Sequence, residues 1–396
     1  MGNGERRVKV LFLTHSFPRG DGDAPGSFVL RLASALRNEG VEATVVAPSG
    51  PDLPSHATLD GVEVTRFHYA PRRYETLAYT GTMATQVQAS SSARVTLLGF
   101  LGAEFNCAVH VRRETKPDIV HAHWWFPNGL VGTWLGRLAN KPLVTTLHGS
   151  DVRLARAVAF ARPGFRHVMH RSTVVTAVSS WLASEAQQVV AAPAPIVAPM
   201  PVATELFTPA GDRSHDRLLF VGRLNRQKGI ELLLHALSRI PNRSVSLDVV
   251  GDGEDREALE TLAGALGIGD RVRWHGALPQ GRLPDFYRSA AALVVPSVGE
   301  GLGLVAVEAQ LCETPVIAFQ SGGLPDVVQH DRTGILVPEV DPGALAAAIV
   351  SLLEREDRGA ALGAAGRMHA VATFAPQSVA RRYADIYRSA IASSPR

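Results

Sequence analysis

Short apolar runs alternate with longer amphipathic stretches along almost the whole chain. In the first half, the runs typical of buried strands are Val8–Leu13, Ala43–Ala47, Val62–Phe67, Ile119–His121, Leu143–Leu147 and Thr173–Val178. Stretches with helical spacing lie between them, such as Phe28–Leu36, and Gly40 follows where a helix would stop. Strands separated by helices predict βαβ units, and therefore an α/β fold with a parallel sheet.

The same rhythm restarts after a proline-rich stretch, residues 191–209, which has five prolines in nineteen positions and is a poor helix. The strands expected after it are Leu218–Val221, Val245–Val250, Val272–His275, Ala292–Val295, Val316–Phe319 and Gly334–Val337, and a longer helix covers Pro342–Leu353. A chain of 396 residues usually forms more than one core. We therefore predict two domains, residues 1–200 and 201–376, with the ligand site in the cleft where the carboxyl ends of their strands face each other.

Composition places the chain among ordinary globular proteins, with 46% hydrophobic and 19% charged residues. Two isolated cysteines, Cys107 and Cys312, provide neither a disulfide framework nor a metal set, which fits a reducing compartment. Residues 1–9 lack the apolar stretch of a signal peptide, and no run of about 18 apolar residues occurs. We therefore expect a cytoplasmic protein.

Charge is unevenly distributed along the chain. Residues 1–200 hold 20 Lys and Arg against 14 Asp and Glu, a net charge of +6, whereas residues 201–396 have a net charge of −3. One interpretation is ordinary solvated surface. The other is peripheral contact of the first half, including Arg72 and Arg73, with the anionic inner face of a membrane. We expect no nucleic-acid partner.

The first motif follows the strand Leu218–Val221 and contains Gly222, Arg223, Lys228 and Gly229. Glycine lets the backbone approach a ligand closely, and Gly229 sits near the start of a helix, where free N–H groups favour anions. A guanidinium and an ammonium over the same loop suit a diphosphate. An ordinary βα loop with exposed basic residues is the alternative.

The second motif, residues 296–308, follows the strand Ala292–Val295. Three glycines, Gly299, Gly301 and Gly303, allow a sharp turn whose following helix would direct its positive end at an anion. Carboxylates such as Glu300 and Glu308 accept several hydrogen bonds from sugar hydroxyls. Alternatively, Glu300 caps the helix and Glu308 is a surface residue, although the apolar neighbours of Glu308 disfavour this.

The third motif lies in the first half, where His121-Ala122-His123-Trp124-Trp125 ends one strand and His148-Gly149-Ser150-Asp151 follows the next. Two histidines at i and i+2 are a weak metal signal without a third ligand. An imidazole beside Gly149 and Asp151 at the end of a strand can instead hydrogen-bond a sugar hydroxyl or a phosphate.

Taken in order, these motifs resemble the retaining glycosyltransferases of family 4, the group 1 glycosyl transferases, whose GT-B fold has two facing Rossmann-like domains. The likeness covers nearly the whole chain. Its elements are Gly26-Ser27, His121-Ala122-His123, His148-Gly149-Ser150-Asp151, Gly222-Arg223-Leu224 with Lys228-Gly229, Val250-Gly251-Asp252-Gly253, His275-Gly276, Pro296-Ser297 through Glu308, Gly322-Gly323-Leu324-Pro325-Asp326 and Thr333-Gly334-Ile335-Leu336-Val337.

The resemblance implies roles for individual residues. Arg223 and Lys228 correspond to the pair that holds the donor diphosphate, beside Gly222. Glu308 corresponds to the ribose ligand, and Glu300 with the amides of Gly301, Leu302 and Gly303 to the group that holds the transferred sugar. His148 corresponds to a histidine on the reacting side of the sugar, and Gly26 to a loop near the phosphate or acceptor. A last helix, about residues 377–396, is expected to pack back on the first domain.

The resemblance also implies the reaction. A hexose-type sugar passes from a UDP- or GDP-sugar to an acceptor with retention of configuration, without cofactor or metal, in cell-envelope glycan or glycolipid biosynthesis. No convincing Asp-x-Asp metal motif is found at the end of a strand. The Asp-x-Asp sequence Asp21-Gly22-Asp23 is instead expected in a loop. Glycosylation of a small natural product is the alternative activity, and a sugar-nucleotide epimerase or a non-catalytic sugar-nucleotide binder are less favoured.

The acceptor, whether a glycan, a lipid-linked or a small molecule, is expected on the first domain. Candidate contacts are His123, Trp124, Trp125 and Asp151, although the tryptophans could be core, and residues 68–105 are expected to shape the pocket. Retention needs either a covalent glycosyl-enzyme or attack from the face of the departing phosphate. We favour front-face attack and keep Asp151 as the alternative nucleophile.

Overall fold

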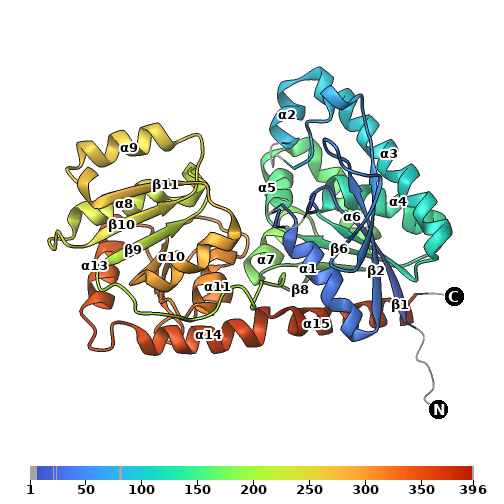
Figure 1. Cartoon of the computed structure of the whole chain (residues 1–396). Helices are drawn as coiled ribbons and strands as arrows, with labels where there is room; N and C mark the ends of the chain where they lie inside the picture. Colours follow the sequence, from blue (N-terminus) through green and yellow to red (C-terminus); the bar gives the residue numbers. More distant parts are fainter. Residues whose placement is uncertain (1–6, 21, 24, 80–82, 395–396) are drawn as a thin grey trace, which may run out of the picture. The chain divides into compact units, whose positions relative to one another are not determined.

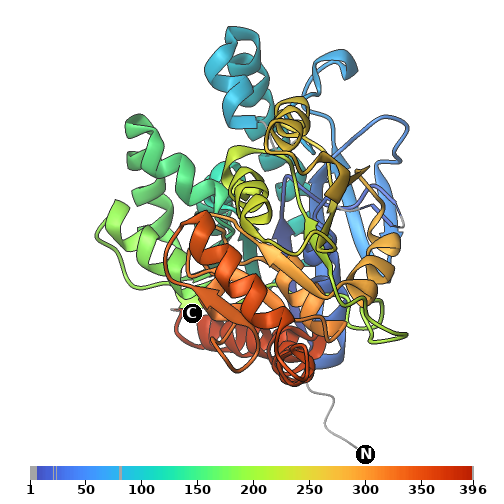
Figure 2. The same cartoon turned by 90° about the vertical axis from the view of Figure 1, so that its left-hand side faces the viewer.

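The computed structural model describes residues 7–20, 22–23, 25–79 and 83–394. Two compact units divide the chain: unit 1 is Met1–Pro201 with Pro376–Arg396, and unit 2 is Val202–Ala375. Each unit has a mainly parallel sheet with helices packed on it, which confirms the predicted α/β class (Figures 1 and 2). Residues 1–6, which are part of the segment 1–9 that lacks the apolar stretch of a signal peptide, and Asp21 lie outside the described residues.

The sheet of unit 1 has, in its described part, the strand order β3-β4-β2-β1-β5-β6-β7-β8. All neighbours are parallel except β3, which is antiparallel to β4. The strands are β1 (Val8–Leu13), β2 (Val41–Pro48), β3 (His56–Leu59), β4 (Val62–Phe67), β5 (Ile119–His123), β6 (Leu143–Leu147), β7 (Val174–Ala177) and β8 (Ile196–Val197).

Two strands of unit 1 were not predicted. The edge strand β3 alternates exposed and half-buried residues, so it has no apolar run to reveal it. The other, β8, has two residues and lies inside the proline-rich stretch that we interpreted as a connector. The six runs that were predicted all form strands, because buried parallel strands are apolar on both faces.

Helices pack on the sheet of unit 1 and bring the end of the chain back to it. They are α1 (Ser27–Leu36), α2 (Met83–Ala89), α3 (Ser91–Thr115), α4 (Leu130–Ala139), α5 (Ser150–Ala157), α6 (Arg162–Arg171), α7 (Ser180–Val189) and α15 (Pro376–Ala392), with the short turns η1 (Arg37–Glu39), η2 (Arg72–Tyr74), η3 (Trp125–Gly129) and η4 (Ala159–Ala161). The last helix, α15, lies beside α1 (Figure 1).

Unit 2 contains, among the described residues, a parallel sheet in the order β11-β10-β9-β12-β13-β14. Its strands are β9 (Arg217–Val221), β10 (Ser246–Val250), β11 (Val272–Gly276), β12 (Ala292–Val295), β13 (Val316–Phe319) and β14 (Ile335–Val337). Its helices are α8 (Ile230–Arg239), α9 (Arg256–Ala265), α10 (Leu283–Ser289), α11 (Leu304–Leu311), α12 (Leu324–Val327), α13 (Pro342–Leu353) and α14 (Ala360–Phe374), with η5 (Arg226–Lys228), η6 (Gly269–Arg271) and η7 (Gln280–Arg282).

Both sheets reverse their strand order at one point, which is where open α/β sheets bind ligands. In unit 2 the reversal lies between β9 and β12, and in unit 1 between β1 and β5. The first two motifs follow β9 and β12 directly, and the His121–Trp125 motif ends β5. The motifs therefore lie at the topological switch points of their own sheets. Among the described helices, none has the length and apolarity that crossing a membrane requires.

Candidate active site

The loop after β9 holds the two predicted diphosphate ligands. Arg223 is exposed, and Lys228 ends the short turn η5. Gly229, with a φ of 67°, is the N-cap residue that precedes α8, and a Cβ there would collide with the carbonyl of Pro296 in the loop after β12. Only glycine both adopts this positive φ readily and leaves room for the Pro296 carbonyl. A glycine at this position therefore lets the two loops approach each other.

A short ion pair joins those loops. Lys228 Nζ donates a hydrogen bond to Glu300 Oε2 at 2.6 Å. Gln227 Nε2 also donates to the carbonyl of Gly299, at 3.1 Å. The predicted diphosphate cation and the predicted sugar carboxylate therefore lie side by side at the switch point of unit 2.

The turn that carries Glu300 is fixed from a third direction, the loop after β13. Gly323 N donates to the Glu300 carbonyl at 2.8 Å, and Ser321 Oγ accepts a hydrogen bond from Gly299 N at 3.0 Å. Gly303, with a φ of 91°, leads into α11, which has no side-chain cap. The alternative interpretation, in which Glu300 caps this helix, is therefore wrong, because the Glu300 carboxylate faces Lys228.

Glu308 lies inside α11 with only 7% of its surface exposed. Its carboxylate accepts hydrogen bonds from Gln280 Nε2 at 3.0 Å and from the Tyr287 hydroxyl at 2.8 Å. Burial and the adjacent Glu308 charge raise the pKa of Tyr287 well above its ordinary value, so this phenol remains a donor. The sequence did not predict Gln280 or Tyr287, because they precede Glu308 by 28 and 21 residues and belong to no motif.

Histidines and aromatic rings gather at the switch point of unit 1. Trp124 follows β5, and its ring centroid lies 4.2 Å from that of His148 and 4.5 Å from that of His15. His123 Nδ1 is 3.2 Å from His148 Nε2, and Phe28 also contacts His148. Burial lowers the pKa of all three histidines, to about 4 for His15 and to about 3 for His123, so these imidazoles are neutral at physiological pH.

Asp151 connects the two loops that hold these rings. Its Oδ1 accepts from the amides of His148, Gly149 and Val152 at 3.1, 2.9 and 3.0 Å, and its Oδ2 from Trp125 N at 3.2 Å. The Trp125 indole in turn donates to the Asp151 carbonyl at 2.7 Å. Asp151 is 4% exposed, and burial outweighs these hydrogen bonds to raise its pKa. As a nucleophile it would have to give up these backbone contacts.

The acceptor residues predicted on unit 1 are largely enclosed. Besides Asp151, the side chains of His123, Trp124 and Trp125 are all buried. Their role in acceptor binding stays a prediction. His121, considered above as a metal ligand, contacts the Tyr387 hydroxyl through Nδ1 and Thr146 Oγ1 through Nε2, both at 2.7 Å. Within the described residues, no group of three or more potential metal ligands occurs.

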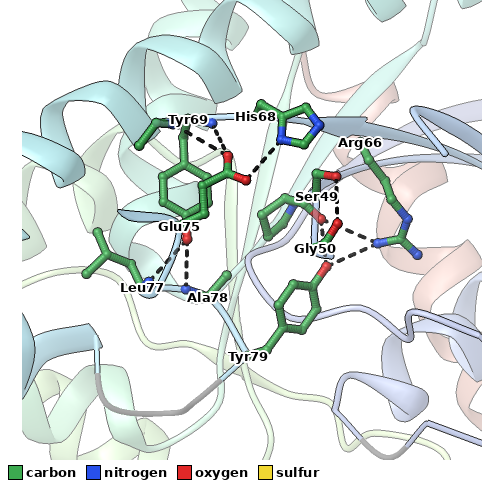
Figure 3. Close-up of polar contacts among 11 residues, drawn as sticks. Ser49, Gly50, Arg66, His68, Tyr69, Glu75, Leu77, Ala78 and Tyr79 are labelled. Carbon is green, nitrogen blue, oxygen red and sulfur yellow. Dashed lines mark hydrogen bonds and ion pairs between the residues drawn. The ribbon is translucent and has the colours of Figure 1, made fainter. Parts of the chain in front are cut away.

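The segment after β4, part of the predicted acceptor region, is tied to two neighbouring loops (Figure 3). Arg66 donates to the carbonyl of Pro18 at 2.6 Å and to the Tyr79 hydroxyl at 3.1 Å, and that hydroxyl donates to the carbonyl of Pro48 at 2.6 Å. Glu75 accepts from Tyr69 N at 2.7 Å and contacts His68 at 2.9 Å. This network orders the segment, and no sequence motif predicted it.

Comparison with known proteins gives two family matches and several similar relatives. Residues 26–206 match the family described as Glycosyltransferase Family 4, and residues 210–369 match the one described as Glycosyl transferases group 1. The chain is 34% identical to D-inositol 3-phosphate glycosyltransferase 1 of Catenulispora acidiphila, over 94% of this chain and 92% of that protein. It is 36% identical to the D-inositol 3-phosphate glycosyltransferase of Mycobacteroides abscessus, over 98% and 90%.

Solved structures show the same architecture. Sucrose-phosphate synthase from Thermosynechococcus elongatus superposes with a TM-score of 0.81 at 25% identity, covering 98% of this chain and all of that one. HepE of Anabaena, solved in complex with UDP-glucose, superposes with a TM-score of 0.72 at 21% identity, covering 97% and 100%. At 21% identity, the likeness to HepE shows the fold alone.

Proposed function

Since the chain belongs to glycosyltransferase family 4 and has the GT-B fold, we propose that it transfers a hexose-type sugar from a UDP- or GDP-sugar to an acceptor with retention of configuration. The Lys228–Glu300 pair at the switch point of unit 2 is the main support. It places a cation suited to a diphosphate beside a carboxylate suited to sugar hydroxyls. Glu308, held by Gln280 and Tyr287, supplies a second carboxylate for the ribose.

In the proposed mechanism the acceptor attacks from the face of the leaving group. The bond from the anomeric carbon to the diphosphate oxygen breaks, the acceptor oxygen bonds to that carbon, and its proton passes to the departing diphosphate. Arg223, Lys228 and the amino end of α11 stabilise the charge that grows on the diphosphate. A neutral His148 donates or accepts a hydrogen bond at the sugar without adding charge.

We propose that the acceptor is a polyhydroxylated glycan or glycolipid of the cell envelope, glycosylated on the cytoplasmic side. A free small molecule is the second candidate, and the relatives named for D-inositol 3-phosphate favour it. A panel containing inositol phosphates, simple sugars and glycolipids, assayed with one donor, discriminates between the two.

A donor screen tests the proposal before any acceptor is known. A ligand at 100 times its Kd stabilises a protein by about 2.7 kcal/mol. UDP- or GDP-sugars should therefore raise the Tm and, with water as acceptor, be hydrolysed slowly to nucleoside diphosphate. A chain that binds no nucleotide-sugar refutes the proposal, and one that binds without ever cleaving a donor is a sugar-nucleotide binder instead.

The same assay tests whether the reaction depends on a metal. Because Arg223 and Lys228 supply the positive charge in our proposal, EDTA should leave the rate nearly unchanged. Loss of activity on chelation, with recovery on adding Mg²⁺ or Mn²⁺, would contradict this assignment.

A further inference from the structure

Unit 1 carries a long stretch that is almost free of acidic residues. Residues 119–184 contain seven Lys and Arg and a single carboxylate, Asp151. That carboxylate is buried and accepts backbone hydrogen bonds, so it does not neutralise the surface. Much of the net +6 of the first half therefore comes from the elements of this stretch.

Several of these cations lie on α4 and α6, and exposed apolar side chains lie on α4 and on η4, the turn before α6. We call the exposed residues of α4, η4 and α6 together the α4–α6 face. Helices α4 and α6 pack together, and Thr133 Oγ1 is 3.3 Å from His167 Nε2. Trp134 and Leu138 on α4 are 41% and 57% exposed, and Phe160 on η4 is 83% exposed. The exposed basic residues of the face are Arg137, Arg162, Arg166, His167, His170 and Arg171.

A groove of about 450 Å³ runs along α6 within this face. Arg162, Arg166 and Arg171 line it, together with His167 and His170, and no acidic residue is among its lining. Guanidinium groups pair with phosphate oxygens through two parallel hydrogen bonds. The chemistry of the groove thus suits anionic phosphate groups.

We propose that the α4–α6 face binds the surface of an anionic phospholipid bilayer. Arginines that attract phosphate headgroups, beside aromatic and aliphatic side chains that enter the headgroup layer, are the combination that holds proteins at such surfaces. A second copy of the chain fits poorly, because a symmetric contact would bring arginine against arginine. A nucleic acid would neutralise the arginines but leave the aliphatic Leu138 without an apolar partner.

Co-sedimentation of the full chain with vesicles tests the proposal without donor or acceptor, so its outcome is independent of the proposed glycosyl transfer. Phosphatidylcholine vesicles containing phosphatidylglycerol should bind the chain at low salt, and pure phosphatidylcholine should bind it far less. Each arginine near an anionic surface contributes about a fivefold factor in binding. Arg166→Gln with Arg171→Gln should therefore weaken binding by about 25-fold.

Two further variants make the experiment specific. Phe160→Ser should weaken vesicle binding while circular dichroism stays unchanged, because this side chain is almost fully exposed. Arg72 and Arg73, which the sequence had suggested as part of a membrane contact, lie on η2 and outside the α4–α6 face. Arg72→Gln with Arg73→Gln is therefore a matched loss of two exposed charges that should change binding little. Equal losses from both arginine pairs, no binding to anionic vesicles at low salt, or binding of duplex DNA in place of vesicles would each overturn the proposal.

Discussion

Lys228 and Glu300 neutralise each other in the structure, and this pairing determines how each should respond to mutation. The Lys228 ammonium lies 2.6 Å from Glu300 Oε2, with both side chains partly buried. Truncating Lys228 would remove a cation and also leave an unpaired carboxylate beside the proposed diphosphate position. Exposed Arg223 has no such partner among the described residues, so its truncation would remove a cation alone.

We expect Arg223→Ala and Lys228→Ala to lower kcat/KM by about 10- to 150-fold, because charge-assisted hydrogen bonds contribute roughly 1.5–3 kcal/mol. The loss should appear in kcat, since charge grows on the leaving diphosphate, and it should be larger for Lys228. Steady-state kinetics with varied donor measure both parameters. Arg226→Ala, an exposed arginine on the same short turn, is the control and should stay near wild type.

Glu308→Ala should act mainly on the KM for the donor, because contacts to a ribose change little during sugar transfer. Loss of this carboxylate also leaves the Tyr287 hydroxyl without an acceptor that it now contacts at 2.8 Å. Glu308→Gln retains an acceptor oxygen and should recover part of the affinity. If Glu308→Ala lowers kcat as strongly as Lys228→Ala does, the ribose assignment is wrong.

At the scale of single elements, α3 contains an unusual buried acid. Glu104 is fully buried, and neither of its carboxyl oxygens has a hydrogen-bond partner among the described residues. Burial raises the pKa of Glu104 well above its ordinary value. The native state therefore holds a proton that the unfolded chain releases, and the free energy of unfolding should fall as the pH rises above the ordinary glutamate pKa.

Glu104→Met should remove this pH dependence and raise the free energy of unfolding at neutral pH by about 1–3 kcal/mol, because the variant no longer has to bury an unpaired polar group. Urea unfolding at pH 5 and pH 8 measures both effects. Glu114→Gln, an exposed position on the same helix, should leave the pH dependence of the parent protein in place. A larger gain at pH 5 than at pH 8 would contradict the sign.

The last helix, α15, belongs to unit 1 although it follows unit 2 in sequence. Tyr387 donates to or accepts from His121 Nδ1 at 2.7 Å, and Tyr383 donates to the carbonyl of Ala198 at 3.1 Å. Both tyrosines are fully buried, and burial raises their pKa. The helix therefore contributes polar contacts as well as apolar surface to the core of unit 1.

Tyr387→Phe should cost about 1–3 kcal/mol of stability, because it leaves a buried imidazole nitrogen without its partner. Thermal unfolding measures the loss, and hydrogen exchange should locate it in the strands β5 and β6 of unit 1. Tyr74→Phe, at an exposed tyrosine of η2, is the matched control. Destabilisation confined to the strands of unit 2 would contradict this account of α15.

For the molecule as a whole, the sequence predicted the two sheets well because buried parallel strands are read directly as apolar runs. The predicted runs Val8–Leu13 and Ala292–Val295 match β1 and β12 residue for residue. Motifs placed at strand ends also predicted which loops would lie together, since topology alone brings the ends of β9 and β12 side by side.

Contacts between residues distant in sequence could not be predicted in this way. Nothing in the motifs showed that Glu300 pairs with Lys228, 72 residues away, or that Gln280 and Tyr287 hold Glu308. Asp151 was expected to face an acceptor, yet its carboxylate accepts four backbone N–H groups. A sequence shows which side chains have the right chemistry, whereas the fold decides what they contact.

Whether this chain transfers a sugar from a nucleotide donor with retention of configuration can be measured by proton NMR of the first product formed. An α-linked UDP- or GDP-sugar is incubated with the enzyme, with an accepted acceptor or with water, and the anomeric signals are followed before mutarotation. Front-face attack predicts that the α product appears first. A β product formed first would contradict the account.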